Sequence, residues 1–435
     1  MSRAPVTLRS AALAFGAFSL VVGSVTLLAH FRGVSRAHAA LGGGDDPPAM
    51  KIAPTRTAAA IAPPFVGLDL THLTTSETEV VAALPNGRVA HLTLDATLQK
   101  AAVATLKQHK LPEGVIVMMD PDTGAILAYA SHSGRVRDLA VEAIAPSASV
   151  FKLVTAAALV DKGATAQTRE CFARSAEQRV LASDLEVDPL RDKWCMSLAT
   201  AMGKSENAVF ARLAHEKLDR PSLESAAHAL GWGEALQFDV PVQPSKLDVP
   251  DDALGFARTA AGFWNTTLSP LHAAAVSATI ARGGVAVRPH IVARITTDTG
   301  QVDYEAPREP ESHRALGEGA AQALTTMMEH TVSEGTSYRA FHDAHRTPFV
   351  AATVAGKTGT LSDSEDHHQA HLYTWFTGFA PSHAKPGERR VAIAVLVVNN
   401  PHWRVKANVV AREMLHEFFR DHQGAPEENP TVATR

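Results

Sequence analysis

Residues 143–163, AIAPSASVFKLVTAAALVDKG, place one charged side chain in the middle of an apolar helix. Between Ser149 and Asp161 the only charged residue is Lys152, and its neighbours are almost all small or apolar. A Pro-Ser pair suits the entry to this helix, and Gly163 suits its end. The position of this lysine requires an explanation, because burial disfavours a charged ammonium group.

Ser149 and Lys152 lie three residues apart, which places them on the same face of the predicted helix. A buried lysine readily becomes neutral and can then accept a proton, and a serine hydroxyl is a weak nucleophile until a base takes its proton. The alternative is a solvated lysine beside a capping serine, because Ser-x-x-Lys should occur about once by chance in a chain of this length. The rest of the sequence decides between these interpretations.

Two further motifs follow along the chain. Ser-Glu-Asn at 205–207 lies in a predicted helix, and Lys-Thr-Gly-Thr at 357–360 lies in a predicted strand. Each motif alone is a weak signal. Ser-x-x-Lys, Ser-x-Asn and Lys-Thr-Gly in this order are typical of penicillin-binding proteins and serine β-lactamases.

With these motifs, the sequence resembles the transpeptidase domain of penicillin-binding proteins over about residues 90–420. The resemblance extends to five other segments: LTLDATLQKAA (92–102), MMDPDTGAILAYAS (118–131), SPLHAAAVSATIARGGVAVRPHIV (269–292), GTSYRAF (335–341) and WFTGFAP (375–381). It implies an α/β (α+β) fold with a mainly antiparallel five-stranded sheet, flanked by helices, and an α-helical subdomain. The active site would lie between the two.

The periodicity of the sequence predicts elements compatible with that fold. We expect strands over 88–95, 114–120, 125–131, 349–361, 371–381 and 389–400, and helices over 96–110, 198–218, 269–284, 317–333 and 408–421. Strands at both ends with helices between them indicate a sheet assembled from distant segments.

The resemblance implies a role for each catalytic residue. Ser149 would attack the substrate carbonyl and Lys152 would accept its proton. Ser205 would relay a proton to the leaving amine, and Asn207 would orient Lys152 and bind the substrate amide. Lys357 would supply positive potential for a carboxylate and lower the pKa of Lys152.

The strand motif would bind substrate. The resemblance implies that Thr358 and Thr360 donate hydroxyls to the substrate carboxylate, and that Gly359 lets the substrate backbone approach closely. The backbone N–H groups of Ser149 and Thr360 would form an oxyanion hole. We predict no cofactor and no metal.

The chain departs from the family pattern in three respects. Ala148 stands where the family usually has glycine, so the loop before the nucleophile is expected to differ, since alanine lacks the backbone freedom of glycine. We expect no glycosyltransferase domain, and we expect only residues 65–89 to serve as an N-terminal pedestal.

Residues 11–29 form an apolar run that follows Arg3 and Arg9. At 1.5 Å per residue such a run spans roughly 28 Å, about one hydrocarbon core. We predict an uncleaved anchor in the inner (cytoplasmic) membrane; the alternative is a signal peptide cut near AHAA at 37–40. The predicted organisation is a cytoplasmic end (1–10), anchor (11–29), linker (30–64), small N-terminal region (65–89), transpeptidase domain (90–422) on the periplasmic or extracellular side, and polar tail (423–435).

Cys171 and Cys195 are the only cysteines in the sequence. In an exported protein we expect them to form a disulfide, and the alternative is two buried thiols. The net charge of −4 and the lack of a basic run argue against nucleic acid as a partner. The acidic and histidine residues at 365–371 favour a solvated loop over a metal site, and Trp375 and Phe376 should pack in the sheet.

The resemblance implies a membrane-anchored D,D-transpeptidase that crosslinks peptidoglycan stem peptides, is inhibited by β-lactams, and works with a glycan polymerase or other wall-synthesis proteins. The same motifs serve D,D-carboxypeptidases, β-lactamases and penicillin sensors, which differ in whether an amine or water accepts the acyl group. A non-catalytic scaffold for wall synthesis is a third possibility, although complete motifs argue against it.

Overall fold

The structure, a computed structural model, describes residues 63–173, 179–362, 371–400 and 402–420. The predicted membrane segment at 11–29 and the polar tail at 423–435 lie outside these residues. Among the helices that are described, none is both long enough and apolar enough to cross a bilayer.

The central sheet has five antiparallel strands in the order β14-β15-β16-β4-β5. Their bounds are Ala355–Ser362 for β14, Leu372–Ala380 for β15, Val391–Asn399 for β16, Glu113–Met119 for β4 and Ile126–His132 for β5. The late strands and the first hairpin meet in the middle of the sheet, so distant segments build it. This confirms the predicted fold class.

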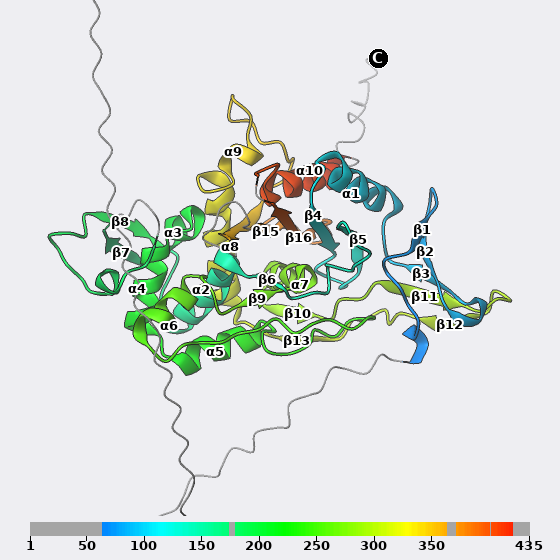
Figure 1. Cartoon of the computed structure of the whole chain (residues 1–435), viewed down its shortest axis with the longest axis horizontal. Helices are drawn as coiled ribbons and strands as arrows, with labels where there is room; N and C mark the ends of the chain where they lie inside the picture. The colour runs from blue at the N-terminus through cyan, green and yellow to red at the C-terminus, as the bar shows by residue number, and fades with distance from the viewer. Residues whose placement is uncertain (1–62, 174–178, 363–370, 401, 421–435) are drawn as a thin grey trace, which may run out of the picture. The chain divides into compact units, whose positions relative to one another are not determined.

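Both faces of the sheet are covered by helices, which is why β16 reads as the unbroken apolar run VAIAVLVV. Ile393 and Val395 face the core beneath α1 (Ala96–Gln108) and α10 (Ala407–Arg420), which lie side by side in Figure 1. Alternate β16 residues face the larger core, which includes α7 (Pro270–Ala281).

A helical subdomain lies next to β14, at one edge of the sheet. It contains α2 (Lys152–Asp161), α3 (Leu198–Lys204), α4 (Asn207–Lys217), α5 (Arg220–Ala229), α6 (Ala253–Ala260) and α8 (Glu318–Ser333). Helix α8 packs against both α3 and β14, so it joins the subdomain to the sheet. The prediction of one helix over 198–218 was wrong, because the chain breaks at Ser205 between α3 and α4.

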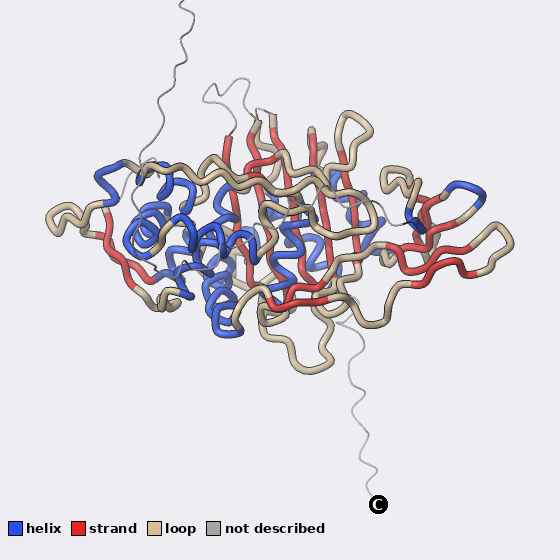
Figure 2. The backbone as a smooth tube through the Cα atoms, turned by 90° about the horizontal axis from the view of Figure 1, so that it is seen from below, coloured by secondary structure: helices blue, strands red, loops and turns tan. Residues whose placement is uncertain are grey.

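A second antiparallel sheet has the order β1-β2-β3-β11-β12 and lies apart from the central sheet in Figure 2. Its strands are β1 (Leu73–Thr75), β2 (Val80–Ala83), β3 (Val89–Leu92), β11 (Val292–Thr296) and β12 (Val302–Glu305). The region predicted at 65–89 therefore shares a sheet with residues far along the chain.

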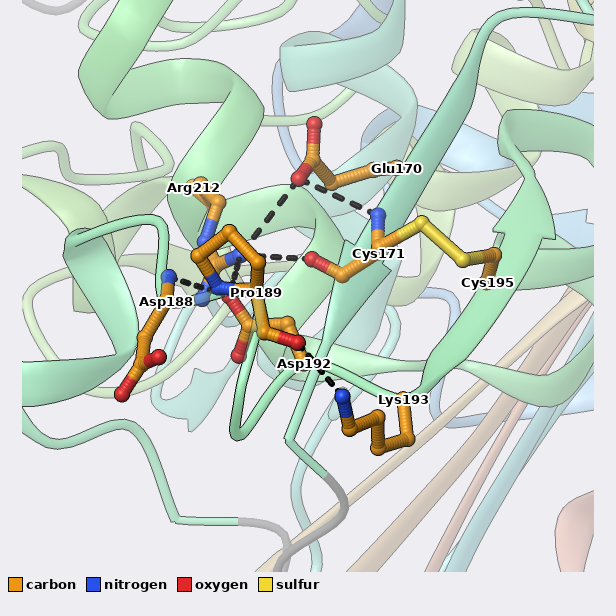
Figure 3. Close-up of a disulfide and its surroundings, with 8 residues drawn as sticks. All are labelled: Glu170, Cys171, Asp188, Pro189, Asp192, Lys193, Cys195 and Arg212. Carbon is orange, nitrogen blue, oxygen red and sulfur yellow. Dashed lines mark hydrogen bonds and ion pairs between the residues drawn. A yellow bond between two sulfur atoms is a disulfide. The ribbon is translucent and has the colours of Figure 1, made fainter.

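A short hairpin of β7 (Arg169–Phe172) and β8 (Trp194–Ser197) carries the two cysteines. Cys171 and Cys195 are direct partners in its register, and the structure joins them in a disulfide with the Cα atoms 4.0 Å apart (Figure 3).

The remaining described elements are short. They are η1 (Pro63–Phe65), η2 (Pro85–Gly87), β6 (Ala145–Pro146), η3 (Ala148–Phe151), η4 (Ala182–Leu185), β9 (Thr267–Leu268), β10 (Val285–Val287), β13 (Ser312–Arg314) and α9 (Tyr338–Phe341).

Candidate active site

Ser149 lies in the turn η3 that leads directly into α2. Ala148, just before it, has a φ of 48°, in the left-handed region that glycine favours. The turn therefore takes a glycine-like conformation although it carries an alanine. The Trp375 ring N–H donates to the Pro146 carbonyl at 2.9 Å and fixes the turn to β15.

Two glycines let the surroundings close on this turn. A Cβ on Gly262 would lie 2.4 Å from the Ala148 carbonyl oxygen, which is too close for any side chain. A Cβ on Gly359 would lie 3.2 Å from the Ala148 Cβ, so this glycine also allows β14 to pack against the turn that carries Ser149. The sequence analysis expected Gly359 to make room for substrate, and it did not identify Gly262.

Lys152 is the first residue of α2 and its side chain is fully buried. Its Nζ lies 2.9 Å from Ser149 Oγ, 2.6 Å from Asn207 Oδ1 and 2.5 Å from the Ala261 carbonyl oxygen. The structure thus brings three predicted site residues together around one amine. The Ala261 carbonyl was not predicted, because a backbone acceptor leaves no mark in residue type.

Burial lowers the pKa of Lys152 to about 7, and the negative charge of Glu206 acts in the opposite direction. A neutral amine has two N–H donors and one lone pair. The two donors can serve Asn207 Oδ1 and the Ala261 carbonyl, which leaves the lone pair directed at the Ser149 hydroxyl. The geometry therefore suits an amine that takes a proton from Ser149.

Ser205 and Asn207 lie at the break between α3 and α4. Ser205 has a φ of 59° and ends α3, while Glu206 precedes α4 and its carboxylate accepts from the Ala208 N–H. A serine in the left-handed region adopts a sparsely populated backbone conformation, and such conformations cluster at functional sites. It turns the Ser205 hydroxyl toward Lys357 while the first residue of α4 contacts Lys152.

Lys357 on β14 is also fully buried. Its Nζ lies 2.9 Å from Ser205 Oγ and 2.8 Å from the Thr358 carbonyl oxygen. Its pKa is lowered well below the usual lysine value, by burial first and then by the positive charge of Lys152. Repulsion between two ammonium groups is mutual, so the site disfavours both lysines being protonated at once.

Thr358, Gly359 and Thr360 follow on β14, an edge strand of the central sheet as far as the chain is described. Thr358 is half-buried and Thr360 is exposed. The Thr358 hydroxyl lies 2.6 Å from the hydroxyl of Thr336, which precedes α9. The sequence analysis did not single out Thr336, although the segment that contains it carries the family resemblance.

Of the acidic and histidine cluster at 365–371, all but His371 lies outside the described residues. The described ranges contain no group of three metal-ligating side chains in a suitable arrangement. Trp375 and Phe376 are buried in the sheet, as expected.

Comparison with known proteins agrees with the fold and the motifs. The family model described as "Penicillin binding protein transpeptidase domain" matches residues 114–418, more than half of the chain. The chain belongs to the penicillin-binding protein transpeptidase domain family.

Among curated proteins, the chain is similar to peptidoglycan D,D-transpeptidase PbpA of Mycobacterium tuberculosis, with 27% identity over 362 residues, 72% of this chain and 68% of the relative. It is also 27% identical over 322 residues to PbpA of Mycolicibacterium smegmatis, covering 65% of this chain and 61% of the relative.

Among solved structures, the crystal structure of PBPA from M. tuberculosis shares the fold with a TM-score of 0.63 and 23% identity. That match covers 75% of this chain and 81% of the other.

Proposed function

We propose that this protein is a membrane-anchored serine D,D-transpeptidase that crosslinks peptidoglycan stem peptides. The observation that carries the proposal is the buried Lys152 amine, which contacts the Ser149 hydroxyl at 2.9 Å while Asn207 and a backbone carbonyl accept its other hydrogen bonds. The family membership and the named D,D-transpeptidase relatives support the choice of reaction.

In the acylation step, Ser149 Oγ attacks the carbonyl carbon of the bond between two D-alanines, and its proton passes to Lys152 Nζ. The negative charge that develops on the carbonyl oxygen is stabilised by the backbone N–H groups of Ser149 and Thr360. The C–N bond then breaks, the proton taken up by Lys152 passes through Ser205 to the leaving nitrogen, and D-alanine departs. Ser149 is left as an ester of the stem peptide.

In the second step, an amine of another stem peptide attacks this ester. A new C–N bond forms, the ester bond to Ser149 breaks, and the proton lost by the amine restores the serine hydroxyl. If water attacked instead, the product would be a trimmed peptide and the enzyme a D,D-carboxypeptidase. The named relatives favour the amine as acceptor.

The proposed substrate carries a terminal carboxylate, which Lys357, Thr358 and Thr360 would bind. A penicillin also presents a carboxylate beside a reactive amide bond, so the same groups would hold it while Ser149 opens its ring. A related structure, penicillin-binding protein A from M. tuberculosis, is described as an imipenem acyl-enzyme complex.

The apolar run at 11–29 would anchor the chain in the cytoplasmic membrane, with residues 1–10 in the cytoplasm and residues 30–64 as a linker to the exported catalytic domain. A glycan polymerase is the partner that this reaction calls for, because crosslinking consumes newly made strands that carry stem peptides.

Labelling of the exported domain with a fluorescent penicillin tests the proposal. We expect wild type and the Ser312→Ala variant, whose serine is exposed on β13, to be labelled equally, and Ser149→Ala to remain unlabelled. Labelling that survives in Ser149→Ala would place the nucleophile elsewhere. A folded wild-type protein that is never labelled would contradict an acylating enzyme.

A further inference from the structure

The segment Gly335-Thr336-Ser337 joins α8 to α9 and is held at fixed points. The Thr336 N–H donates to the Gly203 carbonyl at 3.0 Å, and the Ser337 N–H donates to the Thr331 carbonyl at 2.9 Å. From α10, the Asn408 side-chain amide donates to the Ser337 hydroxyl at 3.2 Å. The position of Thr336 is therefore set by three helices.

Close backbone contact with α3 depends on two glycines. A Cβ on Gly335 would lie 2.1 Å from the Gly203 carbonyl oxygen, and a Cβ on Gly203 would lie 2.7 Å from the backbone of His330. Gly203 is two residues before Ser205, so the segment is fixed against the same helix end that presents Ser205 to Lys357.

This placement puts Thr336 Oγ1 at 2.6 Å from Thr358 Oγ1. Neither side chain is buried, so both hydroxyls can meet a ligand in the site. In a pair of hydroxyls, each oxygen carries one proton, and only one proton can lie between them. The direction of that hydrogen bond decides where the other proton points.

We propose that Thr336 is a positioning residue that donates its proton to Thr358 and so directs the Thr358 proton to the substrate carboxylate. A carboxylate only accepts hydrogen bonds, so Thr358 can serve it only as a donor. Thr336 must then be the donor within the pair. This inference rests on the proposed function, in which Thr358 binds the carboxylate.

Acylation by benzylpenicillin and by its methyl ester distinguishes this role from a structural one, because the ester lacks the anionic acceptor. We expect Thr336→Val, which keeps the shape of threonine, to slow acylation by the acid about three- to tenfold, the worth of one hydrogen bond. Acylation by the ester should be unchanged relative to wild type, and Thr336→Ser should restore the rate with the acid.

A double variant and a matched control complete the experiment. In the Thr358→Val background, the further change Thr336→Val should have no additional effect, because Thr336 acts through Thr358. Thr326→Val removes a hydroxyl that bonds a helix carbonyl elsewhere on α8, and it should acylate like wild type.

Three results would overturn the inference: equal rates for wild type and Thr336→Val with the acid, an equal loss with acid and ester, or additive losses in the double variant. Failure of the proposed function looks different, since then wild type itself would not be acylated at Ser149 by the acid.

Discussion

The protein buries positive charge in two regions, and the two are built in opposite ways. Arg212 on α4 is fully buried, and its guanidinium lies 2.6 Å from the Asp192 carboxylate and 3.5 Å from Glu170 (Figure 3). It also donates to the backbone carbonyls of Asp184 and Cys171 at 2.8 and 2.5 Å. In the proposed active site, Lys152 and Lys357 are just as buried, but the described residues place no carboxylate within ion-pair distance of either amine.

The presence or absence of an acidic partner distinguishes Arg212, whose charge stabilises the fold, from Lys152, whose amine we propose to act in the reaction. A guanidinium stays charged in proteins, so Arg212 needs acidic partners and, once paired, holds the β7–β8 hairpin to α4. A buried lysine without an acidic partner loses its proton more easily, which lowers the pKa of Lys152 to about 7. Helix α4 belongs to both regions, because it begins with Asn207 and carries Arg212 one turn and a half later.

The largest expected effect is on the acylation reaction at the site of Lys152, which has no acidic partner within ion-pair distance among the described residues. Lys152→Met removes the proton acceptor but keeps most of the buried volume, and we expect acylation by a fluorescent penicillin to fall about 10²–10⁴-fold. Loss of the hydrogen bonds to Asn207 and Ala261 should lower the free energy of unfolding by only about 1–3 kcal/mol. A Lys152→Met protein that is acylated at the wild-type rate would contradict the role of the amine.

Substitution of Arg212, which is paired with Asp192, should lower stability and leave acylation intact. Arg212→Met leaves the Asp192 carboxylate buried without its partner, and we expect the free energy of unfolding to fall by about 3–5 kcal/mol. Protein that remains folded should still be acylated at Ser149. Arg220→Met, which breaks the solvent-accessible ion pairs of Arg220 with Glu224 and Asp251, is the control and should unfold like wild type in a urea titration. Equal stability of the two variants would remove the distinction between the regions.

The disulfide beside Arg212 supplies a smaller stabilisation. It closes a loop with a sequence separation of 24 residues, and loop-closure entropy for such a loop corresponds to about 3–4 kcal/mol before any strain. Because Arg212 holds the same hairpin, we expect Cys171→Ala with Cys195→Ala to lose about 2–3 kcal/mol and to retain acylation. Denaturant unfolding of wild type with and without reductant gives an independent measurement. Equal denaturant midpoints in the two conditions would contradict a stabilising contribution of the disulfide.

The smallest effect concerns the turn before Ser149, the proposed nucleophile. Ala148 has a φ of 48°, and a left-handed conformation costs an alanine about 1–2 kcal/mol. Ala148→Gly relieves that cost but adds entropy to the unfolded chain, so we expect stability to rise by up to about 1 kcal/mol. Ala157→Gly in the middle of α2 is the matched control and should lower stability by about 1 kcal/mol or more. Destabilisation of equal size in both variants would refute the account of the turn.

The sequence could predict the parts of this protein that depend on residue type. The apolar runs in β4 and β16 predict strands of a covered sheet, and the isolated Lys152 in an apolar helix predicts an unusual amine. The motif set then identifies which side chains should gather around it. The strand and helix predictions need only local periodicity, whereas the roles of the motif residues come from the resemblance to the family.

Tertiary context decides the features that were missed. The break at Ser205 requires a left-handed serine, and the helical pattern on both sides conceals it although Gly203, Ser205 and Asn207 have low helix propensity. The Ala261 carbonyl is a backbone group, which any residue could supply. Pairing of β3 with β11 joins residues about two hundred positions apart, and no local pattern indicates that partner.

The pH dependence of acylation tests the central claim, that a buried amine without an acidic partner activates Ser149. With Lys152 at a pKa of about 7, the neutral base disappears as the pH falls. We therefore predict that the rate constant for acylation of wild type by benzylpenicillin rises about tenfold per pH unit below pH 7 and levels off above it. A rate constant that stays flat from pH 5.5 to 8.5, or falls as the pH rises in that range while the protein remains folded, would contradict the account.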